Sequence, residues 1–257
     1  MDLYVVSQGS GPAVLFIHAG VADSRMWAHQ MATPRHRSIA YDQRGFGKSP
    51  FVAEPYSNRG DAVAVLDHVG VDSAVIVGCS IGAGTAMELA IEDPERVNGL
   101  ILVGAYPSGW VPEGGFEDNP LEAEAERAAE SGDLDRVVEI DCSMWLVGYG
   151  RTEAEVDPAH RALFLEMDRR AVETSKDRDE HIQHRGFRLD DRLDEIGAPT
   201  LVVAGAHDEK AIIDASRYLA DRLSDRRAVL IENAAHLPSL EQPEAFNAAL
   251  EDFLGSI

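Results

Sequence analysis

Residues 75–84 constrain the fold of this chain more than any other stretch, because one hydroxyl stands between two glycines where an apolar run meets a run of small residues. The hydroxyl belongs to Ser80, and the glycines are Gly78 and Gly82. A Gly-x-Ser-x-Gly turn from a strand into a helix holds its central residue in a strained backbone conformation, and the glycines let neighbouring backbone pass without a clash. The pattern therefore predicts that Ser80 is an exposed nucleophile at a strand–helix junction.

The order of other polar residues along the chain supports this interpretation. A His-Ala-Gly loop at residues 18–20 follows an earlier apolar run, Asp208 follows a later one, and His236 lies near the C-terminus. In these residues the sequence resembles the α/β-hydrolase family, and the resemblance extends through nearly the whole chain. It implies the α/β-hydrolase fold and the serine-hydrolase branch of the family.

Short apolar runs rich in Val, Ile and Leu alternate with helical patterns along the chain. Such runs are typical of strands buried on both faces of a sheet. Their alternation with helices predicts an α/β fold, with a mostly parallel central sheet flanked by helices. The predicted strands are residues 13–17, 38–41, 74–77, 100–103, 200–204 and 228–231, and predicted helices are residues 60–69, 83–91 and 213–223.

The alternation stops in the middle of the chain, where helical patterns follow one another at residues 121–130, 134–145 and 158–174. Strands resume at Thr200, so this stretch is an insertion and not a separate domain at one end. It resembles the helical cap that many α/β-hydrolases place over the active site. We therefore predict a core formed by residues 1–106 and 192–257 and a helical cap formed by residues 107–191.

A serine hydroxyl is a poor nucleophile at neutral pH, so it needs a base within hydrogen-bond reach and a third group that orients the base. His236 is the predicted base, because its surroundings are similar to the late histidine loop of the family. Asp208 is the predicted orienting acid, because residues 205–209 resemble the acid loop of the family. Glu209 and Asp214 are its nearby competitors.

Negative charge develops on the substrate carbonyl oxygen during acyl transfer, and preorganised backbone N–H groups stabilise it. We predict that the N–H groups of Ile81 and Gly20 form this oxyanion hole. The family usually has His-Gly where this chain has His18-Ala19, so Ala19 departs from the family pattern. Residues 42–49 match a turn of the family in which an Asp and an Arg have a structural role.

Other catalytic chemistries have little support in the sequence. Cys79 is a rival thiol nucleophile, but the centre of the turn is Ser80, so Cys79 is interpreted as a buried residue at the end of a strand. No cluster of His, Cys and acidic residues has the spacing of a metal site, and no dinucleotide-binding glycine fingerprint occurs. We therefore predict neither a metal ion nor a cofactor.

The predicted cap supplies the candidates for substrate contacts. Met144 and Trp145 are predicted to line the pocket, since apolar linings with a few polar groups are usual in ligand sites. Arg185 and Arg188, with His184, either meet a substrate carboxylate or pair with the abundant acidic residues around them.

The charge of the chain limits its partners. With 45 acidic and 23 basic residues, the net charge of -22 repels nucleic acid, anionic membranes and highly anionic substrates.

The N-terminus lacks the pattern of a signal peptide, no apolar stretch has the length of a membrane span, and the two cysteines are too few for a disulfide framework. We expect a cytoplasmic protein that acts on a small-molecule substrate, and the sequence leaves homo-oligomer formation open.

The most direct chemistry for these residues is acyl transfer. We predict a serine hydrolase that forms an acyl-enzyme with a small to medium carboxylic ester or lactone, neutral or mildly polar unless a local arginine overrides the net charge. Residues 18–27 resemble the corresponding loop of hydrolases related to enol-lactone hydrolases. Carbon–carbon bond hydrolysis, cofactor-free haloperoxidase or perhydrolase chemistry on the same triad, and a ligand-sensing protein without turnover remain as alternatives, because a fold does not choose among them.

Overall fold

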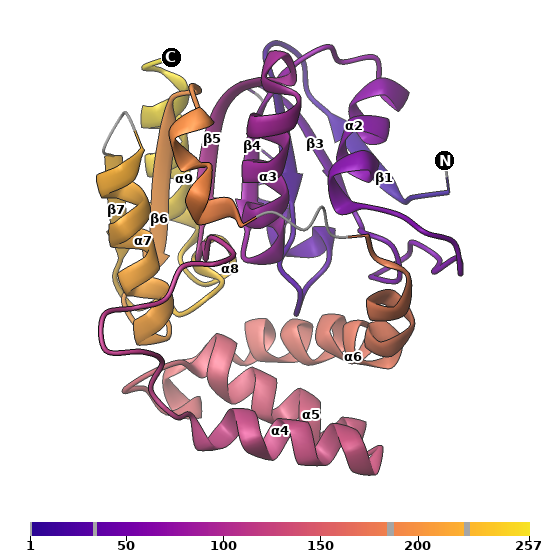
Figure 1. The fold of residues 1–257 in the computed structure, drawn as a ribbon, viewed down its shortest axis with the longest axis vertical. Coiled ribbons are helices and arrows are strands. Elements are labelled where there is room, and N and C mark those ends of the chain that lie inside the picture. The colour runs from indigo at the N-terminus through magenta and orange to yellow at the C-terminus, as the bar shows by residue number, and fades with distance from the viewer. Residues whose placement is uncertain (1, 33–34, 184–187, 224–226) are drawn as a thin grey trace.

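A central sheet flanked by helices forms the core of the protein in the computed structural model, which describes residues 2–32, 35–183, 188–223 and 227–257 (Figure 1). The sheet has 7 strands in the order β1-β3-β2-β4-β5-β6-β7. All neighbouring strands pair in parallel except β1 and β3, so the predicted mostly parallel sheet is confirmed. The strands are β1 (Val5–Gln8), β2 (Ala13–Ile17), β3 (Arg37–Tyr41), β4 (Ala74–Cys79), β5 (Val97–Val103), β6 (Thr200–Gly205) and β7 (Arg227–Ile231).

Burial on both faces of the sheet explains why the strands appear as continuous apolar runs. In β4 every residue is buried, with Val75 and Val77 in the core on one face and Ile76 in the core on the other. The edge strand β1 was not predicted, because its sequence is half polar and two of its four residues are exposed. It adds antiparallel to the edge of the sheet through β3.

Helices cover both faces of the sheet. Helices α2 (Asn58–His68), α3 (Ile81–Glu92) and α7 (Lys210–Arg222) contribute apolar residues to the core on one face. Helices α1 (Ala28–Met31), α8 (Pro238–Glu241) and α9 (Pro243–Leu254) do so on the other face. Short 3-10 turns lie at Ser24–Trp27, Pro94–Arg96, Glu153–Glu155, Leu189–Asp191 and Leu193–Glu195. Among the described residues, no helix combines the length and the apolar character needed to cross a membrane.

The insertion between β5 and β6 is helical. Helices α4 (Pro120–Ser131), α5 (Leu134–Asp141) and α6 (Pro158–His181) lie side by side beyond the end of the sheet where β5 ends (Figure 1). The predicted helix 134–145 is instead α5 followed by a π-helical segment, Cys142–Val147. Helix α6 continues past the predicted end at residue 174 without an apolar stripe, because Lys176, Arg178 and Glu180 are good helix formers and no proline or glycine interrupts the stretch. The exact boundaries of core and cap stay a prediction.

Candidate active site

Ser80 lies on the sharp turn between β4 and α3. Its backbone has φ 55° and ψ −115°, a region that residues other than glycine rarely adopt. A Cβ atom on Gly78 would overlap the backbone of Gly82, and a Cβ on Gly82 would overlap the carbonyl oxygen of Ile17. Both glycines of the motif are therefore required, because α3 packs directly against β4 and β2.

His236 and Asp208 come together from two different loops at the end of the sheet. His236 Nδ1 lies 2.8 Å from Asp208 Oδ2, and both side chains are buried. The other carboxylate oxygen of Asp208 accepts a hydrogen bond from the Glu209 N–H at 2.8 Å. This arrangement fixes the carboxylate and favours a proton on Nδ1, which leaves Nε2 of His236 free to act as a base.

The two competing acids have other partners. The Glu209 carboxylate accepts a hydrogen bond from Asn119 Nδ2 at 2.6 Å, and burial raises the pKa of Glu209. Asp214 pairs with Lys210 and Arg217 on its own helix, at 2.7 and 2.9 Å. Neither acid is bonded to the candidate base in the described structure.

Gly104 lies against the side chains of His236 and Asp208, and it was not among the residues predicted from the sequence. The Ser80 N–H donates to the carbonyl of Val103 at 2.9 Å, and Gly104 follows with φ 51°. A Cβ atom on Gly104 would lie 2.9 Å from His236 Nδ1 and 3.4 Å from Asp208 Oδ2. The only sequence signal for this role is a glycine directly after a buried strand. Within the described chain the Ser80 hydroxyl itself has no hydrogen-bond partner, and such catalytic contacts often tighten only when substrate is bound.

Gly20 and Ile81 lie beside Ser80, at one pocket. A Cβ atom on Gly20 would lie 3.6 Å from the side chain of Ile81, so the two residues are neighbours. Ile81 is the first residue of α3, whose N-terminal N–H groups and dipole favour negative charge. Neither N–H donates a hydrogen bond to a described residue, so both are available to a ligand oxygen. Their role as an oxyanion hole stays a prediction.

His18 holds the loop that carries Gly20. Its Nε2 accepts a hydrogen bond from the Gln43 N–H at 2.9 Å, and its Nδ1 lies 2.8 Å from the carbonyl oxygen of Ala19. Burial lowers the pKa of His18, so the ring is neutral at physiological pH. His18 is therefore a structural residue that positions this loop.

The pocket at Ser80 has a volume of about 600 Å³. This size suits a small to medium ligand, since small-molecule sites usually occupy roughly 300 to 1,000 Å³. The lining combines the loop of Gly20, helix α3, the segment after β5 and the last turn of α6. Its members are Gly20, Phe46, Tyr56, Asn58, Ser80, Ile81, Gly84, Thr85, Glu88, Tyr106, Ser108, Arg178, Asp179, Ile182, Gln183 and Leu189.

Comparison with known proteins identifies the family. The sequence profile of the family described as alpha/beta hydrolase fold matches residues 12–243. The chain belongs to the α/β-hydrolase family. The resemblance noted in the sequence is thus confirmed, and so is the fold class.

Several relatives of this α/β hydrolase are similar over nearly their full length. The 3-oxoadipate enol-lactonase 2 of Acinetobacter baylyi is 29% identical over 250 residues, which cover 95% of this chain and 89% of that protein. The pimeloyl-[acyl-carrier protein] methyl ester esterase of Nitrosospira multiformis is 28% identical over 267 residues, 98% of each chain. The solved structure described as Est816, an N-acyl homoserine lactone degrading enzyme, has a TM-score of 0.77 and 29% identity over 98% of this chain and 96% of that chain.

In this hydrolase the insertion between β5 and β6 contacts the loop of the candidate base. The Trp145 ring lies 4.7 Å from the His236 ring between centroids, and the Trp145 carbonyl accepts the His236 N–H at 3.1 Å. Arg151 pairs with Glu241 at 2.6 Å, and the Glu241 carboxylate also accepts the Ala235 N–H at 2.8 Å. The side chains of Arg151 and Glu241 are only 6% and 4% exposed, so this pair ties the histidine loop to the cap. Sequence reasoning missed it, because charged residues are common throughout the chain.

The residues predicted to contact substrate lie in different places. Met144 is buried and lies near Asn119, and neither Met144 nor Trp145 lines the pocket at Ser80, so their substrate role stays a prediction. Arg188 pairs with Asp190 at 2.7 Å, which agrees with the ion-pairing alternative. His184 and Arg185 lie outside the described residues.

Cys79, the rival nucleophile, lies in the core and not in the pocket of Ser80. Cys79 is buried at the end of β4, with Sγ 3.5 Å from the carbonyl oxygen of His236. Burial raises the pKa of its thiol well above the usual range, so the reactive thiolate is disfavoured. In the described part of the chain, no group of three or more His, Cys, Asp and Glu side chains is placed to hold a metal ion.

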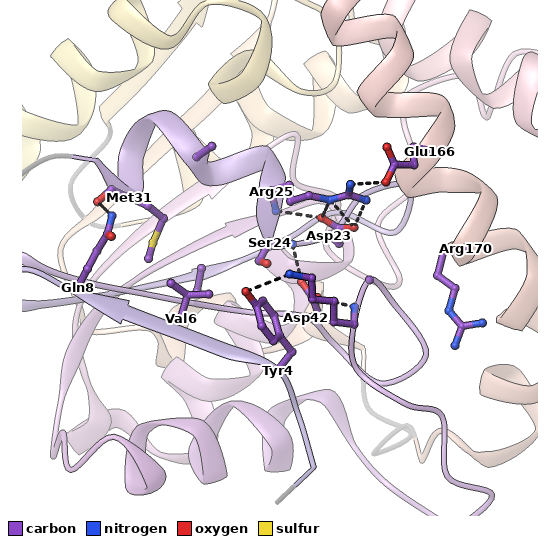
Figure 2. Close-up of a pocket in the computed structure, with 14 residues that line it drawn as sticks. Tyr4, Val6, Gln8, Asp23, Ser24, Arg25, Met31, Asp42, Glu166 and Arg170 are labelled. Carbon is purple, nitrogen blue, oxygen red and sulfur yellow. Dashed lines mark hydrogen bonds and ion pairs between the residues drawn. The ribbon is translucent and has the colours of Figure 1, made fainter.

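A second pocket, of about 460 Å³, lies where α6 meets the edge of the sheet and does not include Ser80 (Figure 2). There the Asp42 carboxylate accepts the Ser24 N–H at 2.8 Å and the Lys48 N–H at 2.7 Å. The structural role predicted for the aspartate of residues 42–49 is therefore confirmed. Arg25 reaches Glu166 of α6 at 2.6 Å, so the polar groups of this pocket mainly join core and cap.

The pH dependence of activity follows from the surroundings of His236. Burial alone lowers the pKa of His236, but the charge and hydrogen bond of Asp208, with Glu209 and Glu241 nearby, raise the net pKa above its ordinary value. A general base works only when it is neutral, so activity is lost as the pH falls through this pKa. We expect kcat/KM to fall about tenfold per pH unit on the acid side, with a midpoint displaced upward from the ordinary pKa of histidine. Initial rates between about pH 5 and pH 9, with circular dichroism as the folding control, check this, and a flat profile contradicts the role of His236.

Proposed function

We propose that this α/β hydrolase is a serine hydrolase that cleaves a carboxylic ester or lactone of small to medium size through an acyl-enzyme. The observation that carries the proposal is the buried pair of His236 and Asp208, whose Nδ1 and Oδ2 atoms lie 2.8 Å apart. The pair lies close to the strained strand–helix turn of Ser80, because the Sγ atom of the preceding Cys79 is 3.5 Å from the His236 carbonyl oxygen. A nucleophile, a base and an orienting acid in this arrangement favour acyl transfer.

The first half of the reaction forms the acyl-enzyme. Ser80 Oγ attacks the carbonyl carbon of the substrate while its proton passes to His236 Nε2, and Asp208 stabilises the resulting imidazolium. The tetrahedral oxyanion accepts hydrogen bonds from the N–H groups of Gly20 and Ile81. When it collapses, the bond to the alcohol oxygen breaks, and His236 gives its proton to that oxygen.

The second half regenerates the enzyme. A water molecule attacks the acyl carbon while His236 takes one of its protons, and a second tetrahedral oxyanion forms in the same hole. Its collapse breaks the bond to Ser80 Oγ, which receives the proton from His236. An ester therefore gives an acid and an alcohol, and a lactone gives a hydroxy acid.

Two further observations support this substrate class. The pocket of about 600 Å³ matches a small to medium ligand. Two of the relatives that cover nearly the whole chain are named for an enol-lactone and a methyl ester, and a similar solved structure is named for an N-acyl homoserine lactone.

A kinetic panel tests the proposal. We expect turnover of p-nitrophenyl acyl esters or lactones, with an optimum at a short or medium acyl chain because of the limited pocket volume. The same assays include an enol lactone, a vinylogous 1,5-diketone and a peroxide-dependent halogenation. Rapid cleavage of the diketone with inert esters and lactones indicates a carbon–carbon hydrolase, and single turnover with tight product retention indicates a ligand sensor. Either result overturns the proposal.

A further inference from the structure

Arg178 is fixed on the wall of the pocket that contains Ser80. It lies in the last turn of α6, and its Nη1 donates to the carbonyl of Ala171 at 2.8 Å and to the hydroxyl of Thr174. Its guanidinium lies over the Phe46 ring, 3.9 Å from the ring centroid. These contacts leave Nε and Nη2 without an acceptor among the residues that the structure describes. The donors that remain form one edge of the planar guanidinium.

The charge of Arg178 has no acidic partner within the described ranges, which is unusual in this chain. Acidic residues outnumber basic ones 45 to 23. On the same helix, Arg161, Arg169 and Arg170 each lie within ion-pair distance of a carboxylate. Arg178 is partly buried, and no carboxylate of the residues that the structure describes lies within 4.0 Å of it.

An unpartnered, partly buried cation is costly. Burial lowers the pKa of Arg178, and the nearby groups Tyr56, Asp179 and Asp168 oppose that shift only in part. Arginine nevertheless stays protonated in proteins, so the pocket holds a positive charge that is incompletely compensated. A ligand anion is the natural group to compensate it, because a carboxylate accepts two parallel hydrogen bonds from a guanidinium edge.

We propose that Arg178 binds a carboxylate of the substrate, so that the preferred ester or lactone carries one negative charge away from the bond that is cleaved. This inference rests on the proposed function, because it places the anion in the same pocket as Ser80. It replaces the expectation of a neutral substrate, since a local arginine overrides the repulsion from the net charge of -22. Glu88 and Asp179 also line the pocket and disfavour substrates with several negative charges.

Hemiesters of dicarboxylic acids test this inference. The substrates are monomethyl succinate, glutarate, adipate and suberate, each compared with its dimethyl ester, which has the same chain without the charge. We expect the wild-type protein to prefer one hemiester over its diester. In Arg178→Gln the ratio of the two kcat/KM values falls by about tenfold or more, mainly through KM, because a charge-assisted contact is lost. Arg178→Lys keeps part of the preference, because it retains the charge without the planar edge.

Arg170→Gln is the matched control. Arg170 lies on the same helix, pairs with Glu173 and belongs to the second pocket, so its substitution leaves the hemiester preference intact (Figure 2). If Arg178 has a purely structural role, Arg178→Gln lowers Tm and lowers the kcat/KM values for the hemiester and the diester equally. An unchanged ratio of these two values therefore overturns the inference. A wild-type preference for every diester also overturns it.

Binding measurements separate this inference from the proposed function. Calorimetry with Ser80→Ala measures the affinity for monomethyl adipate without turnover. The same measurement on the double variant Ser80→Ala with Arg178→Gln gives the affinity that is lost when the guanidinium is removed. If no ester or lactone is cleaved but this loss is observed, the hydrolase proposal fails and the anion site stands. If neutral esters are cleaved and the double variant binds as well as Ser80→Ala, the anion site fails alone.

Discussion

Ser80→Ala is expected to lower kcat/KM for the best ester substrate by at least about 10⁴-fold. The turn holds Ser80 with φ 55°, and without its hydroxyl no covalent acyl-enzyme forms. The remaining activity comes from substrate binding and the oxyanion hole alone. Ester hydrolysis under saturating and dilute substrate, with Tm as the folding control, measures the loss.

Covalent labelling locates the nucleophile independently of the natural substrate. A fluorophosphonate probe should modify Ser80 in the wild-type protein, as shown by mass spectrometry of the labelled peptide. Ser108→Ala is the matched control, because Ser108 is another serine that lines the same pocket, and this variant should still be labelled at Ser80. Undiminished labelling of Ser80→Ala, or no labelling of the folded wild-type protein, rejects the assignment.

Asp208→Asn is expected to lower kcat by about 10³- to 10⁴-fold with little change in stability. The 2.8 Å contact with His236 Nδ1 is lost as a charge-assisted bond, so the imidazolium is less stable and the wrong tautomer is favoured. The pKa of His236 also falls, because the raising effect of Asp208 is removed, and the acid limb of the pH profile moves to lower pH. Steady-state kinetics across the pH range measure both effects.

Asp214→Asn is the control for this substitution, because the ion-pair partners of Asp214 in the described structure are exposed cations of its own helix. It should retain near wild-type kinetics. Combining Asp208→Asn with Ser80→Ala should cost little more than Ser80→Ala alone, because the residues act as a unit. Near-normal activity of Asp208→Asn would move the orienting acid to another residue.

The elements of the fold that depend on local patterns were predictable from the sequence. Continuous apolar runs marked the parallel strands, and β2 agrees with its predicted bounds. Strand β1 escaped prediction because its stability comes from pairing with β3 and not from an apolar pattern of its own. Within the insertion, the sequence indicated helices but not the π-helical segment Cys142–Val147, whose Trp145 carbonyl accepts the His236 N–H.

The sequence by itself determined the strand–helix alternation, the turn at Ser80 and the candidates Asp208 and His236, because these depend on local patterns and on the order of motifs along the chain. Only the tertiary structure placed the Asp208 and His236 side chains in contact, put Gly104 against the histidine ring, and left Arg178 at the Ser80 pocket without an ion-pair partner among the described residues. The physical reason is that these features depend on contacts between residues far apart in the chain. In a sequence with 45 acidic residues, no local pattern shows which charge is paired and which is left for a ligand.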